Sequence, residues 1–196
     1  RYMAYFPSFR YLEDVLLRFR LAHPATQVLS QTSRMSEVAK EAFLAAFDGD
    51  GPTDPSGTLV GFAVMGGIFG EGIDLVGERL VGAIVVGVGL PQLGLERDLI
   101  RHYYDERDIP GFEYAYTYPG LNRVLQAAGR VIRSETDRGL VLLVDRRFGE
   151  ERYRDLFPSA WAQAQSVRGP GQIAAAAAAF WDGRPVETRR YVPTVD

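Results

Sequence analysis

Hydrophobic positions along this chain alternate between short continuous runs and stripes at helical spacing. The run at 3–6 is apolar and ends at Pro7-Ser8, and the apolar residues of 11–19 then recur every third or fourth position. A second short run lies at 28–29, and a second stripe covers 35–47. Short runs favour strands, and spacing of three to four favours helices. The pattern therefore predicts strand, helix, strand and helix in that order.

Two longer apolar runs, 59–65 and 80–88, are rich in valine and isoleucine. Such runs are typical of strands buried on both faces, as in parallel sheets. The run at 140–144 predicts another buried strand, and the segments 94–108 and 119–133 predict helices. Strands that alternate with helices predict an α/β fold in three layers, with a mainly parallel sheet and helices on both faces.

The pattern becomes looser after Arg147. Six consecutive alanines at 174–179 favour a helix that packs lightly, and 188–196 reads as an extended tail. We therefore expect one main domain over 1–157, followed by a helical appendage and tail over 158–196.

Composition removes several classes of function. The chain has 22 Lys+Arg, 25 Asp+Glu, two His and no Cys, for a formal net charge of -3. Without cysteine it cannot supply a disulfide, a thiolate nucleophile or a cysteine-bound metal cluster. Lys40 is the only lysine and lies between Ala39 and Glu41, so the chain has no phosphate loop of the Gly-Lys-Ser/Thr type.

Hydropathy and composition also suggest a location. No apolar run approaches the roughly 20 residues that cross a bilayer, so we expect a soluble protein with no membrane contact. Abundant arginine and alanine beside a single lysine suggest a bacterium with a GC-rich genome. The expected location is cytoplasmic and nucleoid-associated.

One group of candidate residues lies near the end of the helix predicted over 119–133. On a helix, Gln126, Arg130 and Arg133 have the spacing i, i+4 and i+7, so one face presents an amide and two guanidiniums, while Val131 and Ile132 point to the core. Arginine is suited to phosphates because its planar fork is always charged. We expect both guanidiniums to face the edge of the sheet where the strands end.

Gly129 lies between these residues. A glycine inside a helix costs about 1 kcal/mol relative to alanine, so its presence suggests that another group approaches the backbone there. The alternative reading of this whole group is a solvated arginine face paired with Glu135 and Asp137.

A glycine-rich segment, 66–74, directly follows a predicted strand. Its four glycines include Gly67 and Gly72, and they would let the backbone approach a ligand with its amides exposed. Asp74 could accept hydrogen bonds from hydroxyl groups such as those of a ribose. The alternative is a glycine-rich connector that binds nothing.

The first strand ends at Pro7-Ser8-Phe9-Arg10, where a helix is predicted to begin. Ser8 is a suitable N-cap residue. The free amides of a helix N-terminus, together with Arg10, could hold a phosphate. The alternative is an ordinary helix cap.

Taken together and in this order, the three segments resemble the C-terminal RecA-like motor domain of XPD/DinG-type superfamily-two DNA helicases. The resemblance runs from about Tyr5 to Phe157 and includes a strand that ends at Asp145-Arg146-Arg147-Phe148. Residues 5–8, 66–74 and 126–133 match helicase motifs four, five and six.

The resemblance implies roles for these residues. ATP and Mg²⁺ would bind in a cleft between two RecA-like domains, mainly through the phosphate loop and carboxylates of the N-terminal domain. Arg130 and Arg133 resemble arginine fingers that reach the γ-phosphate, with Gln126 positioning the phosphates or the attacking water. Gly72, Asp74 and Gly129 would lie on the nucleotide side. Contacts to the single-stranded DNA backbone are expected from Ser8, Phe9, Arg10 and Gly67.

The resemblance also implies an activity and partners. A parent polypeptide would carry the N-terminal RecA-like domain, bind single-stranded DNA and translocate from 5′ to 3′ in DNA repair or related processes. Any iron–sulfur cluster would belong to another part of that polypeptide. The 196-residue chain alone is expected to lack ATPase activity. The alternative is a non-catalytic module with a RecA-like fold that binds nucleic acid or docks a partner.

Overall fold

The computed structural model describes residues 1–48, 57–71, 80–132 and 137–183. These residues form two compact units, Arg1–Asp145 and Arg146–Asp196. The domain boundary predicted near residue 157 stays a prediction.

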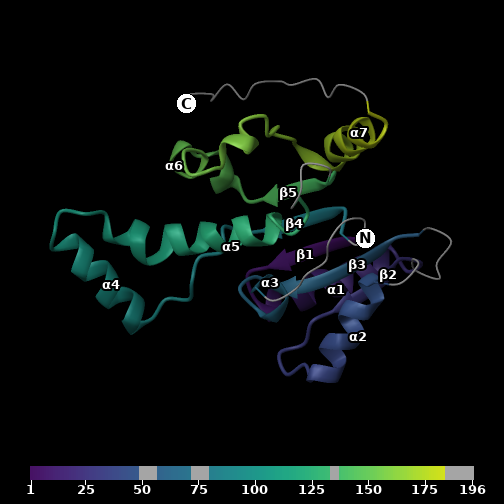
Figure 1. Cartoon of the computed structure of the whole chain (residues 1–196), viewed down its shortest axis with the longest axis horizontal. Coiled ribbons are helices and arrows are strands. Elements are labelled where there is room, and N and C mark those ends of the chain that lie inside the picture. Colours follow the sequence, from purple (N-terminus) through teal and green to yellow (C-terminus); the bar gives the residue numbers. More distant parts are fainter. Residues whose placement is uncertain (49–56, 72–79, 133–136, 184–196) are drawn as a thin grey trace. The chain divides into compact units, whose positions relative to one another are not determined.

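A five-stranded parallel sheet forms the centre of the first unit (Figure 1). The strand order is β2-β3-β1-β4-β5, which places β1 in the middle. Tyr2 pairs with Val60 on one side and with Gly82 on the other. The prediction of a parallel sheet is confirmed for strands β1 (Tyr2–Phe6), β2 (Gln27–Ser30), β3 (Leu59–Val64), β4 (Gly82–Val86) and β5 (Leu140–Val144).

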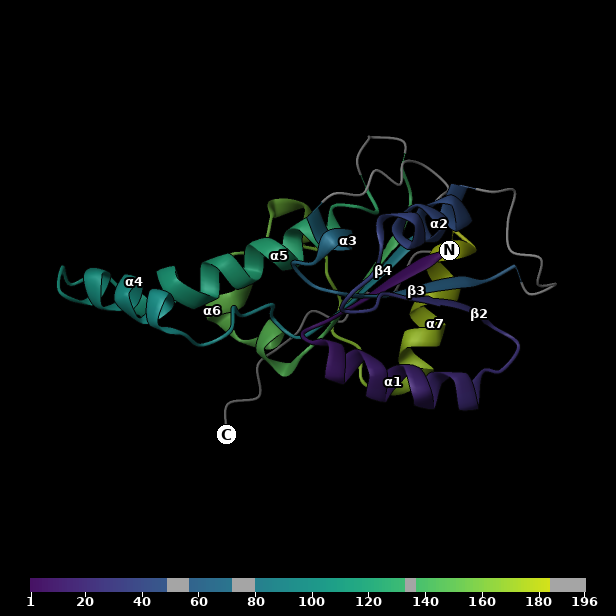
Figure 2. The same ribbon diagram turned by 90° about the horizontal axis from the view of Figure 1, so that it is seen from below.

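Helices cover both faces of this sheet, as Figure 2 shows. The helix α1 (Phe9–Ala22) packs on one face, where its buried Leu12 joins a cluster with Phe6 and Phe62. The helix α2 (Glu37–Asp48) packs on the opposite face, where Phe47 lies against Gly61 of β3. The three-layer α/β arrangement is therefore confirmed, and each face buries its own apolar cluster.

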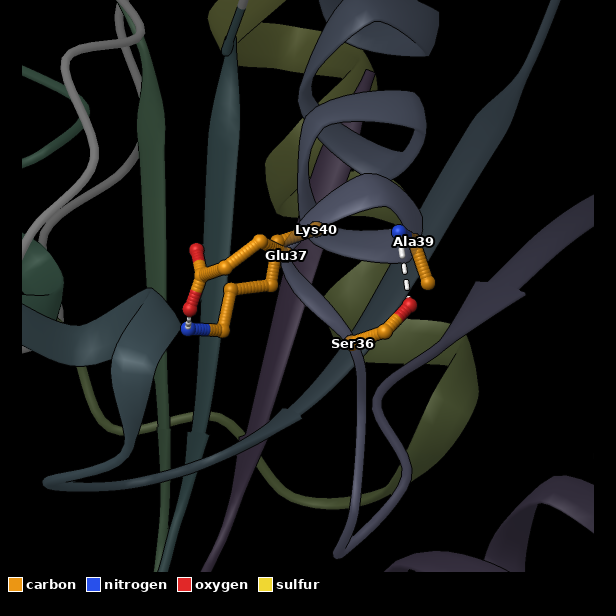
Figure 3. Close-up of polar contacts among 4 residues, drawn as sticks. All are labelled: Ser36, Glu37, Ala39 and Lys40. Atoms are coloured by element: carbon orange, nitrogen blue, oxygen red, sulfur yellow. Dashed lines mark hydrogen bonds and ion pairs between the residues drawn. The ribbon is translucent and has the colours of Figure 1, made fainter.

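The start of α2 is fixed by local polar contacts (Figure 3). The Ala39 backbone N–H donates to Ser36 Oγ over 3.2 Å, so Ser36 satisfies one of the free amides at the N-terminus. Lys40 Nζ forms an ion pair with Glu37 Oε1. The only lysine of the chain is therefore engaged within a helix.

After β4 the chain forms α4 (Leu95–Asp105), a π-helical turn η2 (Glu113–Thr117) and α5 (Tyr118–Ala128). The prediction of a charged helix over 94–108 is confirmed, and the π-helical turn is a feature that the sequence did not reveal. The prediction that α5 continues to Arg133 is wrong, because α5 ends at Ala128 and residues 129–131 form a turn.

The prediction that the strand at 140–144, β5, is buried also needs correction. Its residues Leu140 to Leu143 are only partly buried and Val144 is exposed. β5 is the last strand of the order, with one neighbouring strand, β4. A strand at the edge of a sheet can be as apolar as a central strand, so the hydrophobic run alone did not distinguish the two positions.

The second unit contains η3 (Arg146–Gly149), α6 (Glu151–Arg154), η4 (Ser159–Trp161) and α7 (Gly169–Trp181). Phe157 contacts Phe148 and Trp161, with ring centroids 6.1 and 5.3 Å away. None of the residues of the alanine-rich α7 is buried, which confirms a helix that packs lightly. No helix in the described parts of either unit is long and apolar enough to span a bilayer.

Candidate functional site

The loops that follow the strands line up along one side of the sheet, which we call the carboxyl edge. Backbone hydrogen bonds continue the pairing beyond the strands: Met65 N–H donates to Phe6 O over 2.9 Å, and Gln31 N–H donates to Phe62 O over 2.8 Å. The parallel order therefore brings the ends of β1, β2 and β3 together. Loops at the carboxyl ends of parallel strands are the usual ligand sites of open α/β sheets.

Ser8 follows β1 at this edge and begins α1. Its Oγ accepts a hydrogen bond from the Tyr11 N–H over 3.2 Å, so the predicted N-cap is confirmed. Ser8 and Arg10 are exposed and Phe9 is half-buried, which leaves this helix N-terminus accessible from solvent. Contact of Ser8, Phe9 and Arg10 with DNA stays a prediction.

The first half of the glycine-rich segment forms a tight turn after β3. Gly67 N–H donates to Val64 O over 3.2 Å, and Gly66 has a φ of 69°, a left-handed conformation that glycine adopts without strain. A short helix, α3 (Ile68–Glu71), follows. Gly67 thus lies at the carboxyl edge, whereas Gly72 and Asp74 lie outside the described residues.

Gln31 is a residue of this edge that the sequence analysis did not select. It follows β2, is 6% exposed, and its Oε1 accepts a hydrogen bond from the Val64 N–H over 2.9 Å. A Cβ at Gly67 would stand 3.1 Å from Gln31 Nε2. The side-chain amide therefore lies directly against the turn. A polar residue immediately after an apolar run was the available signal.

Arg123 is the second residue that was not selected. It lies on α5, and its Nη1 donates to Gly89 O, in the loop after β4, over 3.4 Å. A Cβ at Gly66 would stand 2.9 Å from Arg123 Nε. The guanidinium therefore contacts the loops after β3 and β4. Its position three residues before Gln126 gave no indication of these distant contacts.

The direction of α5 separates the candidate residues into two groups. A Cβ at Gly120, in the first turn of α5, would stand 2.7 Å from Val88 O at the carboxyl edge. At the other end, the Val131 side chain lies against Gly139, and Leu140 N–H donates to Val81 O over 3.0 Å just before β4. The helix α5 therefore runs antiparallel to β4 and ends beside the opposite, amino edge of the sheet.

Arg130 consequently lies near the amino edge. The backbone of Arg130 therefore lies at the edge opposite to the one that both guanidiniums were expected to face, because a helix antiparallel to the strands must end where the strands begin. The direction of the two guanidiniums stays a prediction. The 11 residues of α5 span about 16 Å along its axis. Ser8 and Gly67 lie at the carboxyl edge of the sheet, and the turn that contains Arg130 lies near the amino edge.

Gln126 and Arg130 do not share one helical face, because α5 ends at Ala128. Gln126 is exposed in the last turn of α5, but Arg130 lies beyond the helix end, where it is half-buried and contacts other residues of the chain. Arg133 lies outside the described residues. Because the helix stops early, the spacing does not fix the relative directions of these side chains.

Gly129 has a simpler role than a close approach within a helix. It is the C-terminal cap of α5, with φ −64° and ψ −9°, and its N–H donates to Leu125 O over 2.8 Å. In the described residues, the atoms within 4 Å of a Cβ at this position belong to Leu125 and Gln126 of the same helix. Of the two apolar residues that follow, Val131 is buried as predicted, but Ile132 is 51% exposed.

A partly buried hydrogen bond connects α4 with the π-helical turn that leads into α5. Tyr116, in η2, is 1% exposed, and its hydroxyl donates to Asp98 Oδ1 of α4 over 2.9 Å. Burial raises the pKa of Tyr116, and the hydrogen bond to the Asp98 carboxylate acts in the same direction. This bond joins η2 to α4.

Metal-binding chemistry has no candidate among the residues with described positions. Those residues contain no group of three or more His, Asp or Glu side chains that could hold a metal ion.

Comparison with known proteins gives the family. Residues 1–164 match the helicase C-terminal domain family. A regulator of telomere elongation helicase 1 homolog from Aedes aegypti is 29% identical over 82% of this chain. The general transcription and DNA repair factor IIH helicase subunit XPD from Arabidopsis thaliana is 26% identical over 80% of this chain. The chain spans only 17% and 21% of the lengths of these two relatives.

Solved structures agree on the fold. A structure described as XPD helicase is similar over 79% of this chain and 26% of its own length, with a TM-score of 0.58 and 21% sequence identity. A second structure, described as the apo form of XPD, gives the same TM-score. The fold is therefore RecA-like, and the chain belongs to the helicase C-terminal domain family, as a domain of the XPD/DinG type of superfamily-two helicases.

Proposed function

We propose that this chain is the C-terminal motor half of an ATP-dependent DNA helicase. In this proposal ATP hydrolysis drives translocation on single-stranded DNA in the 5′ to 3′ direction, and translocation unwinds the duplex. The observation that carries the proposal is the path of α5, which runs from the loops at the carboxyl edge to Arg130 near the amino edge. One helix thus joins the two groups of residues that a DNA-driven ATPase must connect.

The carboxyl edge is assigned to DNA. The N-terminus of α1, with exposed Ser8 and Arg10, offers backbone amides and a guanidinium to a phosphate. Phe9 would support this contact, and the Gly67 turn would let a sugar-phosphate backbone approach closely. Contacts to phosphate and sugar carry little sequence information, which suits a motor that must bind every sequence.

The turn at the end of α5 is assigned to the nucleotide. Arg130 and Arg133 would stabilise the charge on the γ-phosphate in the transition state, an effect worth about 10³ to 10⁵ in rate in comparable enzymes. Gln126 would position the phosphates or the attacking water. Gly72, Asp74 and Gly129 complete this side, with Asp74 directed to the ribose.

Two further roles, binding of the ATP phosphates and binding of Mg²⁺, are assigned to the N-terminal RecA-like domain of a longer polypeptide. That domain would hold the phosphates of ATP and Mg²⁺, because this chain has no phosphate loop and its lysine is paired with Glu37. An iron–sulfur cluster, where one exists, would be bound by cysteines outside these 196 residues. The relatives named above come from an insect and a plant, so the bacterial, nucleoid-associated location stays a prediction.

The test compares the 196-residue chain with a polypeptide in which it is joined to its first motor domain. We expect no ATP hydrolysis by the chain alone and hydrolysis stimulated by single-stranded DNA in the joined protein. Arg130→Ala should reduce that hydrolysis by at least about 10³-fold while leaving the circular dichroism spectrum unchanged. Hydrolysis by the Arg130→Ala protein at the parent rate would show that Arg130 is not an arginine finger. A joined parent protein without DNA-stimulated hydrolysis would favour the non-catalytic module.

A further inference from the structure

The turn from Val64 to Gly67 is held from two sides by side chains. On one side, Gln31 Oε1 accepts the Val64 N–H over 2.9 Å, and its Nε2 would be 3.1 Å from a Cβ at Gly67. On the other side, Arg123 Nε would be 2.9 Å from a Cβ at Gly66. The turn therefore lies between an amide that follows β2 and a guanidinium on α5.

Glycine at position 66 serves two purposes in this arrangement. Its φ of 69° belongs to the left-handed region, where other residues are strained. In addition, any Cβ there would force the Arg123 guanidinium to move, because a separation of 2.9 Å is shorter than van der Waals contact allows. The Arg123 guanidinium therefore lies directly against the turn, in space that only a glycine at position 66 leaves open.

Arg123 also contacts the loop after β4. Its Nη1 donates to Gly89 O over 3.4 Å, and a Cβ at Gly89 would stand 3.3 Å from Gly120 C of α5. One half-buried side chain thus joins two loops of the carboxyl edge to the first half of α5. Because a helix is rigid along its axis, a displacement of this half is carried to the turn at Gly129 and Arg130.

We propose that Arg123 is a positioning residue that couples the Gly66–Gly67 turn to α5, and through α5 to Arg130. This inference rests on the function proposed above. DNA bound at the turn would shift or fix α5 through the guanidinium, and so place Arg130 for hydrolysis. Arginine is required because its fork can contact two loops at once, whereas a lysine presents one compact charge.

The first experiment measures coupling in the joined protein with both motor domains. The measured quantity is the ratio of the ATPase rates with and without oligo-dT. In Arg123→Met we expect this ratio to fall about tenfold, within the usual range of coupling between sites, with the KM for ATP unchanged. Arg123→Lys should give an intermediate ratio. Asn122→Ala, a change at an exposed neighbour on α5, should keep the parent ratio.

The second experiment needs no catalysis. In the 196-residue chain, amide hydrogen exchange of Val64, Met65 and Gly67 should be faster in Arg123→Met than in the parent, and unchanged in Asn122→Ala. Gly66→Ala, which places a methyl group against the guanidinium, should accelerate the same amides. A double-mutant cycle between Gly66→Ala and Arg123→Met should be non-additive, because the clash of the added methyl group with the guanidinium is absent when Arg123 is replaced, while the strain of the left-handed backbone remains.

The outcomes separate the two proposals. A parent protein without DNA-stimulated ATPase would refute the proposed function, and the exchange data would still decide whether Arg123 holds the turn. A stimulated parent whose ratio is unchanged in Arg123→Met would overturn the role of Arg123 alone. If Arg123→Met does not fold, Arg123→Lys and Gly66→Ala decide the question by the same ratio, and parent-like ratios in both would overturn the inference.

Discussion

The Oε1 atom of Gln31 accepts a hydrogen bond from the backbone N–H of Val64, 33 residues later in the chain, over 2.9 Å. This contact crosses from the loop after β2 to the last residue of β3, where the ladder of the sheet ends. It satisfies a backbone donor that the sheet no longer pairs, and it does so from a side chain that is 6% exposed.

The first prediction concerns the stability of this edge. Gln31→Met keeps the length of the side chain but leaves the Val64 N–H without its acceptor, so the free energy of unfolding should fall by about 1–3 kcal/mol in urea denaturation. The matched control is Gln27→Met, at the first residue of β2, the strand that Gln31 follows. Gln27 Oε1 is buried without a hydrogen-bond partner in the described structure, so its loss should not destabilise the fold. Equal destabilisation by both changes would contradict the role of Gln31.

The second prediction separates two roles of Ser8. Ser8→Ala removes the N-cap of α1 and should lower the free energy of unfolding by about 1 kcal/mol. Ser8→Asp keeps a capping oxygen, so stability should be retained, but the added negative charge should weaken binding of fluorescent oligo-dT to the joined protein. Ser36→Ala is the control, because it removes an equivalent cap from α2 and should leave DNA affinity unchanged. Unaltered affinity in Ser8→Asp would exclude a close phosphate contact.

The third prediction concerns alkaline pH. Because the pKa of Tyr116 is raised in the folded chain, folding favours the neutral phenol. Its contribution is fully present below the unfolded pKa of about 10 and is lost as the pH rises through the folded pKa. Unfolding free energies measured between pH 8 and pH 12, a range of about two units on either side of that value, should therefore fall more steeply in the parent than in Tyr116→Phe. Tyr103→Phe, at an exposed tyrosine, is the control for loss of a hydroxyl.

The fourth prediction concerns packing at Gly61 in β3. A Cβ there would meet Met3 Sδ, and would lie 2.9 Å from Phe47 Cζ and 3.0 Å from Phe43 Cζ. Gly61→Ala should therefore overpack the face of the sheet covered by α2 and lower thermal stability by about 1–3 kcal/mol. Gly171→Ala, in α7, has no neighbouring atom within 4 Å and should not destabilise. A parent-like melting temperature for Gly61→Ala would show that the Phe43 and Phe47 rings move apart at little cost in free energy.

Much of the fold followed from local sequence pattern. The apolar runs and helical stripes located β1 to β5, α1, α2 and α4 to within a few residues, and Ser8 was identified as an N-cap. The order of three motifs indicated the family. The match of residues 1–164 to the helicase C-terminal domain family confirms it. These features depend on residues close together in sequence, whose spacing reflects the period of the strand or helix that they form.

The candidate site was only partly predictable. Spacing placed Arg130 on a helix because nothing local marks the end of α5 at Ala128, apart from a glycine that was interpreted differently. Gln31 and Arg123 carried no motif, and their contacts with Val64, Gly66 and Gly89 depend on strand order.

The sequence by itself determined the alternation of strands and helices, the lack of a phosphate loop and the resemblance to helicases, because each is carried by residue types and short-range spacing. Only the tertiary structure decided which loops share the carboxyl edge, and that α5 carries the chain from that edge to the turn at Arg130. The physical reason is that strand order and helix direction are fixed by packing between segments far apart in the chain, which local periodicity does not encode.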